Sequence, residues 1–369
     1  MTITNIFYLT LLIIFFTYTG YPILLLLLSL FKKNKASYSQ YIPTISLIIA
    51  CHNEEKVIEE KILNSLNLDY PKDKLEIIIF SDGSTDKTED IIKKYEEKGI
   101  KLLSFPNHPG KTICQNKSVE RAKGEIIVFS DANSMYKRDV IIKLIKPLQD
   151  KKNGVTVGCL KYGKEINSNS GESSYWNYEN LLKKTESQLG MLLGANGAIY
   201  AIRKRDYIPL KSWVISDLTE PLKINLKKLS TVYCPEAIAY EEPPKSNLKR
   251  KTRIILRSLN SLPEYISLLN VFKYKQLSFA LFWHKLMRWL SPLWLIIVFI
   301  LNLAIVLQIE SSTIFSLMLY LQIVSYVLAI LGRYIKILKP LNYFLQVNLA
   351  SLIAIVLAIR GKKQITWKV

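Results

Sequence analysis

Three short polar runs hold residues that could do chemistry, and each follows a stretch of apolar residues. The runs span Cys51 to Glu55, Ser81 to Asp86 and Ser130 to Asn133. Each run alone has an ordinary structural explanation, because Asn53, Ser84 or Thr85 could begin a helix and Asp-Gly is a common turn. Three acidic or amide-bearing runs after successive apolar stretches instead indicate one shared site.

The side chains in these runs suit a nucleotide-sugar ligand. A carboxylate such as Asp82 can accept hydrogen bonds from a base and a ribose, while Asp131 can hold a divalent metal that bridges a diphosphate. Asn133 follows Asp131 by two residues, which is the same side of an extended chain. Mg²⁺ and Mn²⁺ prefer hard oxygen ligands, so Asp131, helped by Asn133, and two phosphates would make an adequate site.

Alternating strands and helices would bring the three runs together. Short runs rich in Ile and Val predict strands, and segments with apolar residues at helical spacing follow three of them. This order predicts a mostly parallel sheet with helices on both faces, which binds ligands at the carboxyl ends of its strands. The predicted strands are Ile45–Ala50, Leu75–Phe80, Ile100–Ser104 and Glu125–Phe129, and the predicted helices are Glu54–Leu66, Asp86–Tyr95 and Thr112–Ala122.

These motifs resemble family 2 glycosyltransferases, which have the α/β GT-A fold with a Rossmann-like sheet. The resemblance rests on Ser46 to Glu55, Asp82-Gly83-Ser84 and Asp131-Ala132-Asn133, and it covers about residues 42 to 260. It implies an inverting, metal-dependent hexosyltransferase with a nucleotide-sugar donor, a UDP-sugar being expected. Within the family the chain is most similar to membrane-bound polysaccharide synthases related to cellulose, chitin and hyaluronan synthases, and to their non-processive relatives.

The resemblance also assigns roles to single residues. Lys111, in Pro109-Gly110-Lys111, matches a loop whose lysine approaches the donor phosphates. A second segment matches the part of the family that abuts the acceptor sugar. The implied donor-binding residues are Asn53, Glu55, Asp82, Ser84, Lys111, Asp131 and Arg253, and the implied acceptor segment is Gly194, Ala195, Asn196 and Gly197.

Asp217 matches the family's general base. An inverting transfer needs one base to take the proton of the acceptor hydroxyl. Family members carry two acids where this chain has Ser216-Asp217, so the base is kept and one carboxylate is lost. Glu220, one helical turn later, is an alternative base, and a solvated surface aspartate is the ordinary explanation for Asp217.

The segment from Arg250 to Ile254 falls where processive synthases carry Gln-x-x-Arg-Trp. Only Arg253 matches, and an arginine there can bind phosphate oxygens bidentately. Ile254 stands where those synthases have Trp, so the aromatic side chain on which a sugar could stack is absent. This difference favours one or a few transfers over processive synthesis with polymer secretion, and it leaves the acceptor open among a lipid-linked sugar, a lipid phosphate and a growing glycan.

Composition predicts a membrane protein, since 49% of the 369 residues are hydrophobic. The stretch from Ile6 to Phe31 is uncharged and longer than the roughly 30 Å hydrocarbon core requires. Lys32, Lys33 and Lys35 follow it, so its C-terminal flank is expected in the cytoplasm. Three more uncharged runs span 290–309, 311–332 and 340–359.

The third C-terminal run conflicts with the distribution of charge. Glu310 suits the outside, and the basic residues between the second and third runs suit the inside. Four spans would then place the basic tail, Arg360 to Lys368, outside. Either one run is re-entrant or interfacial, or the basic tail is an exception to the rule that basic residues stay inside. The last run carries amide side chains and is therefore the least suited to contact with lipid.

Together these patterns predict four regions: a transmembrane helix at 1–31, a cytoplasmic catalytic domain at 32–244, a basic interfacial segment at 245–288, and two to three spans with a basic tail at 289–369. The expected location is the plasma (inner) membrane. The segment from Lys245 to Arg288 holds ten basic residues and one acid, Glu264, as a helix on anionic lipid headgroups would.

Other protein classes explain the sequence less well. The net charge of +20 would suit a nucleic-acid-binding protein, but the basic residues gather beside the apolar runs, so no nucleic-acid partner is expected. A transporter would not explain the large soluble region. A catalytically inactive membrane scaffold is the remaining alternative, because Ser216 and Ile254 depart from the family pattern. The four cysteines form no metal or disulfide pattern.

Overall fold

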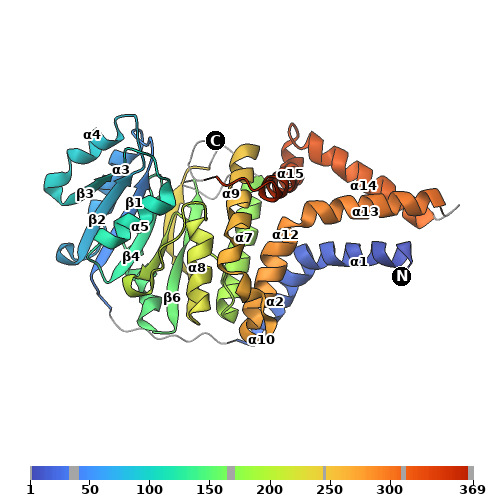
Figure 1. The fold of residues 1–369 in the computed structure, drawn as a ribbon, viewed down its shortest axis with the longest axis horizontal. Helices are drawn as coiled ribbons and strands as arrows, with labels where there is room; N and C mark the ends of the chain where they lie inside the picture. Colours follow the sequence, from blue (N-terminus) through green and yellow to red (C-terminus); the bar gives the residue numbers. More distant parts are fainter. Residues whose placement is uncertain (1, 33–40, 164–170, 244–246, 309–312, 365–369) are drawn as a thin grey trace.

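The structure is a computed structural model that describes residues 2–32, 41–163, 171–243, 247–308 and 313–364. A sheet covered by helices forms one end of the molecule (Figure 1). Helices α1, α13 and α14 extend from the other end, and α7, α8 and α9 lie between the two parts.

The sheet has eight strands in the order β3-β2-β1-β4-β7-β6-β8-β5. The first four are parallel, β7 runs antiparallel between β4 and β6, and β6 is parallel to β8. The predicted parallel sheet is therefore confirmed for β1 to β4. The strands are β1 Ile45–Cys51, β2 Leu75–Ser81, β3 Ile100–Ser104, β4 Ile126–Asp131, β5 Met135–Tyr136, β6 Asn153–Tyr162, β7 Tyr200–Arg203 and β8 Ser230–Glu241.

Both faces of the sheet are buried, as the apolar runs predict. Alternate residues of β1 enter different cores: Leu47 and Ile49 pack with Ile58 of α3, whereas Ile48 packs with Cys114 of α5. A strand buried on both faces reads as a continuous apolar run. The helices around the sheet are α3 Ile58–Leu66, α4 Thr88–Lys93, α5 Lys111–Arg121, α6 Val140–Ile145, α7 Gly171–Leu189, α8 Ser216–Leu226 and α9 Leu248–Ser261.

Four described helices are long and apolar enough to cross a membrane: 3–30, 291–308, 313–331 and 336–359. Large apolar side chains on them are exposed, such as Leu12 and Ile314, which suits contact with lipid. The chain is therefore a membrane protein. The helices are α1 Ile3–Phe15, the π-helix η1 Phe16–Gly20, α2 Tyr21–Leu30, α13 Ser291–Gln308, α14 Thr313–Leu331, η9 Lys336–Leu338 and α15 Lys339–Ile359.

Short helices connect α9 to α13. They include a π-helical stretch, η8, and such stretches occur often at functional sites. Phe272 is 92% exposed on this connection, as a residue inserted among lipids would be. The elements are η6 Leu262–Glu264, η7 Ile266–Leu269, α10 Val271–Tyr274, α11 Gln276–Ala280, η8 Leu281–Leu286 and α12 Met287–Trp289. Lys33, Lys35, Lys245, Glu310 and Lys368 lie outside the described residues.

Helix α15 packs mainly against α9. Lys251 of α9 donates to Oε1 of Gln346, in the first half of α15, at 2.9 Å, and Asn260 donates to the carbonyl oxygen of Lys362, just after the end of α15, at 3.0 Å. Figure 1 shows α15 nearly end-on, whereas α1 and α13 lie across the view. The last apolar run therefore does not share the direction of the other apolar helices.

Candidate active site

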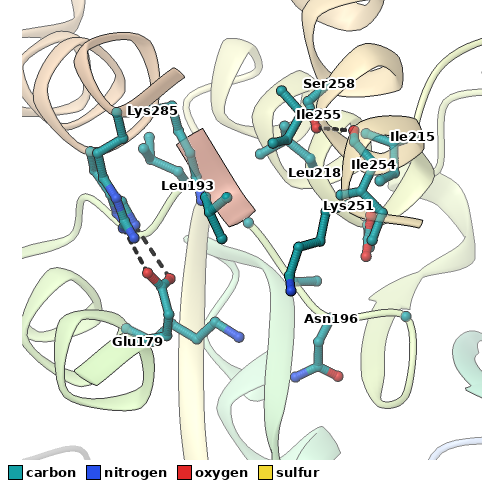
Figure 2. A pocket seen from close by; sticks show the side chains of 18 of the residues that line it. Glu179, Leu193, Asn196, Ile215, Leu218, Lys251, Ile254, Ile255, Ser258 and Lys285 are labelled. Carbon is teal, nitrogen blue, oxygen red and sulfur yellow. Dashed lines mark hydrogen bonds and ion pairs between the residues drawn. The ribbon is translucent and has the colours of Figure 1, made fainter. Parts of the chain in front are cut away.

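A cavity of about 680 Å³ joins the sheet to the apolar helices. Lys111, Asp131 and Asp217 line it on the side of the sheet, and Tyr18 and Phe344 line it on the side of the apolar helices. Figure 2 shows Lys285 and Glu179 on one flank and Lys251, Ile254 and Ile255 of α9 on the other. The same cavity is thus lined by charged side chains and by apolar side chains.

Asp131 is the last residue of β4, and Ala50 of β1 lies beside it. Its Oδ1 forms an ion pair with Nζ of Lys111, the first residue of α5. A side chain at Gly197 would disturb this pair, because a Cβ there would lie 3.1 Å from Lys111 Nζ and 3.2 Å from Asp131 Oδ2. Glycine at this position therefore lets the acceptor segment approach the ion pair.

Carboxyl groups crowd around Asp131. Burial raises the pKa of Glu54 to about 7 and that of Glu241 to about 7, and the charge of Asp131 adds to both shifts. Burial also raises the pKa of Asp217, against the effect of Lys111, while Asp131 adds to the rise. Negative charge is therefore concentrated at the end of β4.

This oxygen-rich, acidic environment fits Mg²⁺ or Mn²⁺. Among the described residues, no three His, Cys, Asp or Glu side chains are grouped to hold a metal by themselves. Asp131 would therefore be the protein ligand, and donor phosphates and water would supply the rest. Asn133 is exposed and does not line the cavity. Side chains two residues apart point to the same side only in an extended chain, and here β4 ends at Asp131 and the chain turns.

Asp217 lies in the first turn of α8 and lines the cavity. Its Oδ1 is buried and has no hydrogen-bond partner among the described residues. Its carbonyl oxygen accepts a hydrogen bond from the backbone N–H of Ala195 at 2.8 Å, so the acceptor segment fixes its position. A buried carboxylate with an uncommitted oxygen is suited to accept a proton.

Glu220 does not line this cavity. Its carboxyl group is buried and accepts hydrogen bonds from Tyr200 at 2.8 Å and Gln115 at 3.3 Å. Burial raises the pKa of Glu220 to about 8. Glu220 Oε1, like Asp217 Oδ1, is buried without a partner among the described residues, so the difference between the two carboxyl groups is that Asp217 lines the cavity and Glu220 does not.

All four residues of the acceptor segment, Gly194, Ala195, Asn196 and Gly197, line the cavity. The amide of Asn196 is committed to the fold: its Nδ2 donates to the carbonyl oxygen of Gly158 at 3.1 Å, and its Oδ1 accepts from the N–H of Ile199 at 3.0 Å. The segment is therefore a rigid wall next to Asp217.

Asp82 lies at the neighbouring strand end. It is fully buried, its Oδ1 accepts from the N–H of Gly110 at 3.0 Å, and its Oδ2 is buried with no partner among the described residues. Gly110 adopts φ +94°, a conformation that only glycine takes readily, and Lys111 follows it. This contact links Asp82 to the Lys111–Asp131 pair.

The other residues predicted to bind the donor connect β1 to β2. The N–H of Asn53 donates to Ser84 Oγ at 3.1 Å, and Asn53 Oδ1 accepts from Thr85 at 2.7 Å. Glu55 Oε2 accepts from the N–H of Lys87 at 3.2 Å. None of Asn53, Glu55, Asp82 and Ser84 lines the 680 Å³ cavity, so these residues form a separate, adjacent edge.

Two histidines at this edge escaped the sequence analysis. The rings of His52 and His108 stack with centroids 4.5 Å apart, and Nδ1 of each lies within 2.8 Å of the carbonyl oxygen of Asp82. His52 lies in the first polar run and His108 directly precedes Pro109-Gly110-Lys111, but the two are far apart in sequence and neither was assigned a role. Only the loops after β1 and β3 bring them together.

Helix α9 presents Arg250, Lys251 and Ile254 to the cavity, whereas Arg253 does not line it. Arg257 donates to Thr112 Oγ1 at 3.0 Å and to the carbonyl oxygen of Val214 at 2.5 Å. Burial lowers the pKa of Arg257 to about 10, although Asp217 opposes the shift. Arg257 therefore ties α9 to the segment just before Asp217.

Comparison with known proteins finds a family to which part of the chain is similar. Residues 46–208 match the glycosyl transferase family 2 model. Similar curated proteins are a probable glycosyltransferase, YdaM, of Bacillus subtilis (29% identity; 56% of this chain, 52% of the relative), and the poly-beta-1,6-N-acetyl-D-glucosamine synthase of Staphylococcus epidermidis (24%; 57% and 52%). Another is the beta-monoglucosyldiacylglycerol synthase of a Nostoc strain (25%; 50% and 41%). The chain spans about half the length of these relatives.

Among solved structures, the mannosyltransferase PcManGT of Pyrobaculum calidifontis, in complex with GDP-mannose and Mn²⁺, has a TM-score of 0.75 at 20% identity and covers 97% of this chain and 99% of that one. The fold is therefore the GT-A fold of nucleotide-sugar transferases with added apolar helices, as predicted. Within that fold, residues 46–208 resemble family 2 glycosyltransferases, and the relatives of the chain include a polysaccharide synthase and a glycolipid synthase.

Proposed function

We propose that this chain transfers a hexose, with inversion, from a nucleoside-diphosphate sugar to an acceptor held at the membrane. The main support is the continuous cavity, because it joins Asp131 and Lys111 to Asp217 and continues to Tyr18 and Phe344 of the apolar helices. A water-soluble acceptor would not need a cavity that is lined by the apolar helices.

The donor would lie across the ends of β1, β2 and β4. Asp82, with an unpaired buried oxygen, would bind the nucleoside, and Lys111 would contact the diphosphate. A divalent metal at Asp131 would offset charge that develops on the leaving diphosphate. The Pyrobaculum mannosyltransferase holds GDP-mannose and Mn²⁺, which supports this class of donor and cofactor. A UDP-sugar is the expected donor.

Asp217 would act as the general base. It would accept the proton of the acceptor hydroxyl, whose oxygen forms a bond to the anomeric carbon as the bond from that carbon to the diphosphate breaks on the opposite face. The buried, unpaired Oδ1 and the raised pKa of Asp217 suit this role. Gly194 to Gly197 would place the acceptor against it.

The acceptor would be a lipid-linked or membrane-proximal molecule that receives one or a few sugars. Ile254 lines the cavity where processive synthases have a sugar-stacking aromatic residue. The Nostoc relative is named for a glycolipid product. Processive synthesis of a secreted polymer is the second candidate, and the similarity to the Staphylococcus synthase favours it.

A direct test is sugar transfer by purified protein with Mg²⁺ or Mn²⁺ and a panel of radiolabelled nucleotide sugars, in the presence of extracted membrane lipids. The proposal predicts label from one donor in the lipid-extractable fraction. Label in insoluble polymer alone would support the second candidate, and no transfer from any donor would refute both.

A further inference from the structure

Helix α9 carries an arginine that the proposed reaction does not use. Arg257 is only partly exposed, and it does not line the cavity, so it is not placed to contact the acceptor. Arg253 of the same helix was expected to bind the donor, yet it does not line the cavity either. The role of Arg257 must therefore come from its contacts with the rest of the chain.

Arg257 connects two segments that hold proposed reacting groups. Its Nη2 donates to Thr112 Oγ1 at 3.0 Å and to the carbonyl oxygen of Val214 at 2.5 Å, and Thr112 Oγ1 itself donates to that carbonyl oxygen at 3.1 Å. Thr112 directly follows Lys111 of the donor loop. Val214 lies three residues before Asp217. These hydrogen bonds therefore hold the start of α5 against the segment that leads into α8.

A second contact of α9 lies one helical turn further along. Ser261 Oγ accepts a hydrogen bond from the N–H of Ile215 at 3.1 Å and donates to the carbonyl oxygen of Arg257 at 2.6 Å. Helix α8 begins at the next residue, Ser216. Both residues that precede α8 are therefore held by α9, while Ala195 holds the carbonyl oxygen of Asp217 from the other side.

The positive charge of Arg257 also acts on the proposed base. Arg257 forms no ion pair with an acidic side chain of the described ranges, and its Nε is buried without a hydrogen-bond partner among them. Burial lowers the pKa of Arg257, and the charge of Asp217 opposes this shift. Burial raises the pKa of Asp217, and Lys111 and Arg257 oppose the rise. Arg257 and Asp217 therefore each stabilise the charged form of the other.

The other cations near Asp217 have different partners. Lys111 forms an ion pair with Asp131 and would contact the donor diphosphate. Burial lowers the pKa of Lys183, and the charge of Glu179 opposes this shift more than that of Asp217 does. Asp217 is, by contrast, the acid that acts on Arg257. The charged and titratable groups that act on Asp217 or feel its charge are Lys111 of α5, Asp131 of β4, Lys183 of α7, Tyr200 of β7, Glu220 of α8 and Arg257 of α9.

We propose that Arg257 is a positioning residue for the transfer reaction, which bridges Thr112 and Val214 and so holds the carboxylate of Asp217 in a fixed place relative to the donor loop. This role rests on the proposed function, because it acts through Asp217 as the base. The charge of Arg257 also favours the ionised form of Asp217, which is the form that accepts a proton. A residue in this role affects the rate of transfer but not the affinity for the donor.

The pH dependence of the rate separates this role from a general effect on folding. Transfer from the donor that the wild type uses, at saturating concentration, is measured with purified full-length protein in nanodiscs that contain extracted membrane lipid. Arg257→Gln should lower the rate at neutral pH by about tenfold or more, because it removes charge-assisted hydrogen bonds. Its acid limb should move to higher pH, because Asp217 loses a nearby cation, so the loss should shrink as pH rises.

Three further variants separate the charge from the bridge. Arg257→Lys keeps the charge but not the planar fork, so its acid limb should stay near that of the wild type while its rate lies between those of the wild type and Arg257→Gln. Thr112→Val removes one end of the bridge without touching the cation, so the rate should fall and the acid limb should stay in place. Lys249→Gln is the matched control, since Lys249 is exposed on α9 and does not line the cavity, and it should change neither.

Donor affinity and folding are measured on the same samples, by calorimetry with nucleoside diphosphate and Mn²⁺ and by thermal unfolding. An acid limb that stays in place in Arg257→Gln, or moves as far in Lys249→Gln, would overturn the proposal. A full rate in Thr112→Val would do the same, and this test holds even if Arg257→Gln does not fold. Loss of donor affinity in folded Arg257→Gln would make Arg257 a donor ligand instead.

The same measurements distinguish this role from the proposed function. Absence of transfer by the wild type from any donor refutes the proposed function and the role of Arg257 with it. Transfer by the wild type with a rate and pH profile that Arg257→Gln leaves unchanged refutes only the role of Arg257.

Discussion

At the scale of single residues, Asp131 connects the parts of the site. Asp131 pairs with Lys111, and it is one cause of the raised pKa values of Glu54, Glu241 and Asp217. A Cβ at Gly197 would lie 3.2 Å from Oδ2 of Asp131, so a side chain there would crowd the ion pair. One carboxylate thus links the donor loop, the acceptor segment and the proposed base.

The change Asp131→Asn should reduce transfer by about 10²-fold or more, because it removes the only protein charge proposed to hold the metal. The protein should remain folded in membranes, as measured by its unfolding temperature. EDTA should inactivate the wild type, and added Mg²⁺ or Mn²⁺ should restore it. Full activity in EDTA would contradict the metal assignment.

Asp217→Asn should lower kcat by about 10²-fold or more while donor affinity stays nearly the same, since Asp217 is proposed to act on the acceptor proton. Glu220→Gln is the comparison: its carboxyl lies off the cavity, and a glutamine can keep the contact with Tyr200. A large loss in Glu220→Gln with none in Asp217→Asn would show that Glu220 is the base.

The raised pKa of Asp217 also predicts a pH profile. The base works only when deprotonated, and burial keeps Asp217 protonated to a higher pH than an ordinary aspartate. Activity should therefore rise with pH through an acid limb that lies above about pH 4. A rate that stays constant down to pH 4 would be inconsistent with a buried aspartate base.

At the scale of elements, the loops after the strands determine which side chains meet. Gly110 connects Asp82 to Lys111, and its φ of +94° with ψ of 149° is strained for any other residue. Gly110→Ala should weaken donor binding, measured by calorimetry with nucleoside diphosphate, and cost about 1–3 kcal/mol of stability.

Gly99→Ala provides a control at another glycine of positive φ. Gly99 also has positive φ, +86°, but it precedes β3 and nothing lies within 4 Å of a Cβ placed there. This variant should lose about 1 kcal/mol of stability and keep its donor affinity. Equal loss of donor affinity in both variants would mean that general destabilisation, not the loop at Gly110, is responsible.

The predictable elements were those with strong local signals. The strands β1, β2, β3 and β4 were predicted to within two residues. A strand buried on both faces, such as β1, is continuously apolar, and the edge strand β3 still keeps three apolar residues among its five. The position of Glu179 in the cavity has no comparable signal, since its partner Arg288 lies more than 100 residues away in the sequence. Asn133 was assigned by strand alternation, which does not apply after the end of β4.

At the scale of the whole molecule, the packing of α15 bears on which side of the membrane the basic tail lies. Gln346 in α15 and Lys362 just beyond its end both contact α9, and Figure 1 shows α15 running in another direction than α1 and α13. Lys363, beyond α15, lies 4.2 Å from the ring of Trp213 in the catalytic domain. We infer that α15 lies at the membrane surface and that the tail stays on the catalytic side.

Labelling of introduced cysteines tests this topology, since the four native cysteines are buried. Lys362→Cys should react with a membrane-impermeant thiol reagent from the same side as Lys98→Cys, an exposed position in the catalytic domain. In intact cells neither should react, and in inverted vesicles both should, if the domain faces the cytoplasm. Reaction of the two positions from opposite sides would show that α15 spans the membrane.

Transfer of a sugar from a nucleotide donor to a membrane acceptor in this cavity can be measured with protein reconstituted in liposomes of extracted membrane lipid. Radiolabelled donor is supplied to the wild type and to Asp217→Asn side by side. We expect label in an extractable lipid with the wild type only, and equal donor binding by both proteins. Transfer of equal rate by Asp217→Asn, or long polymer released on the far side of the liposome from donor alone, would contradict this expectation.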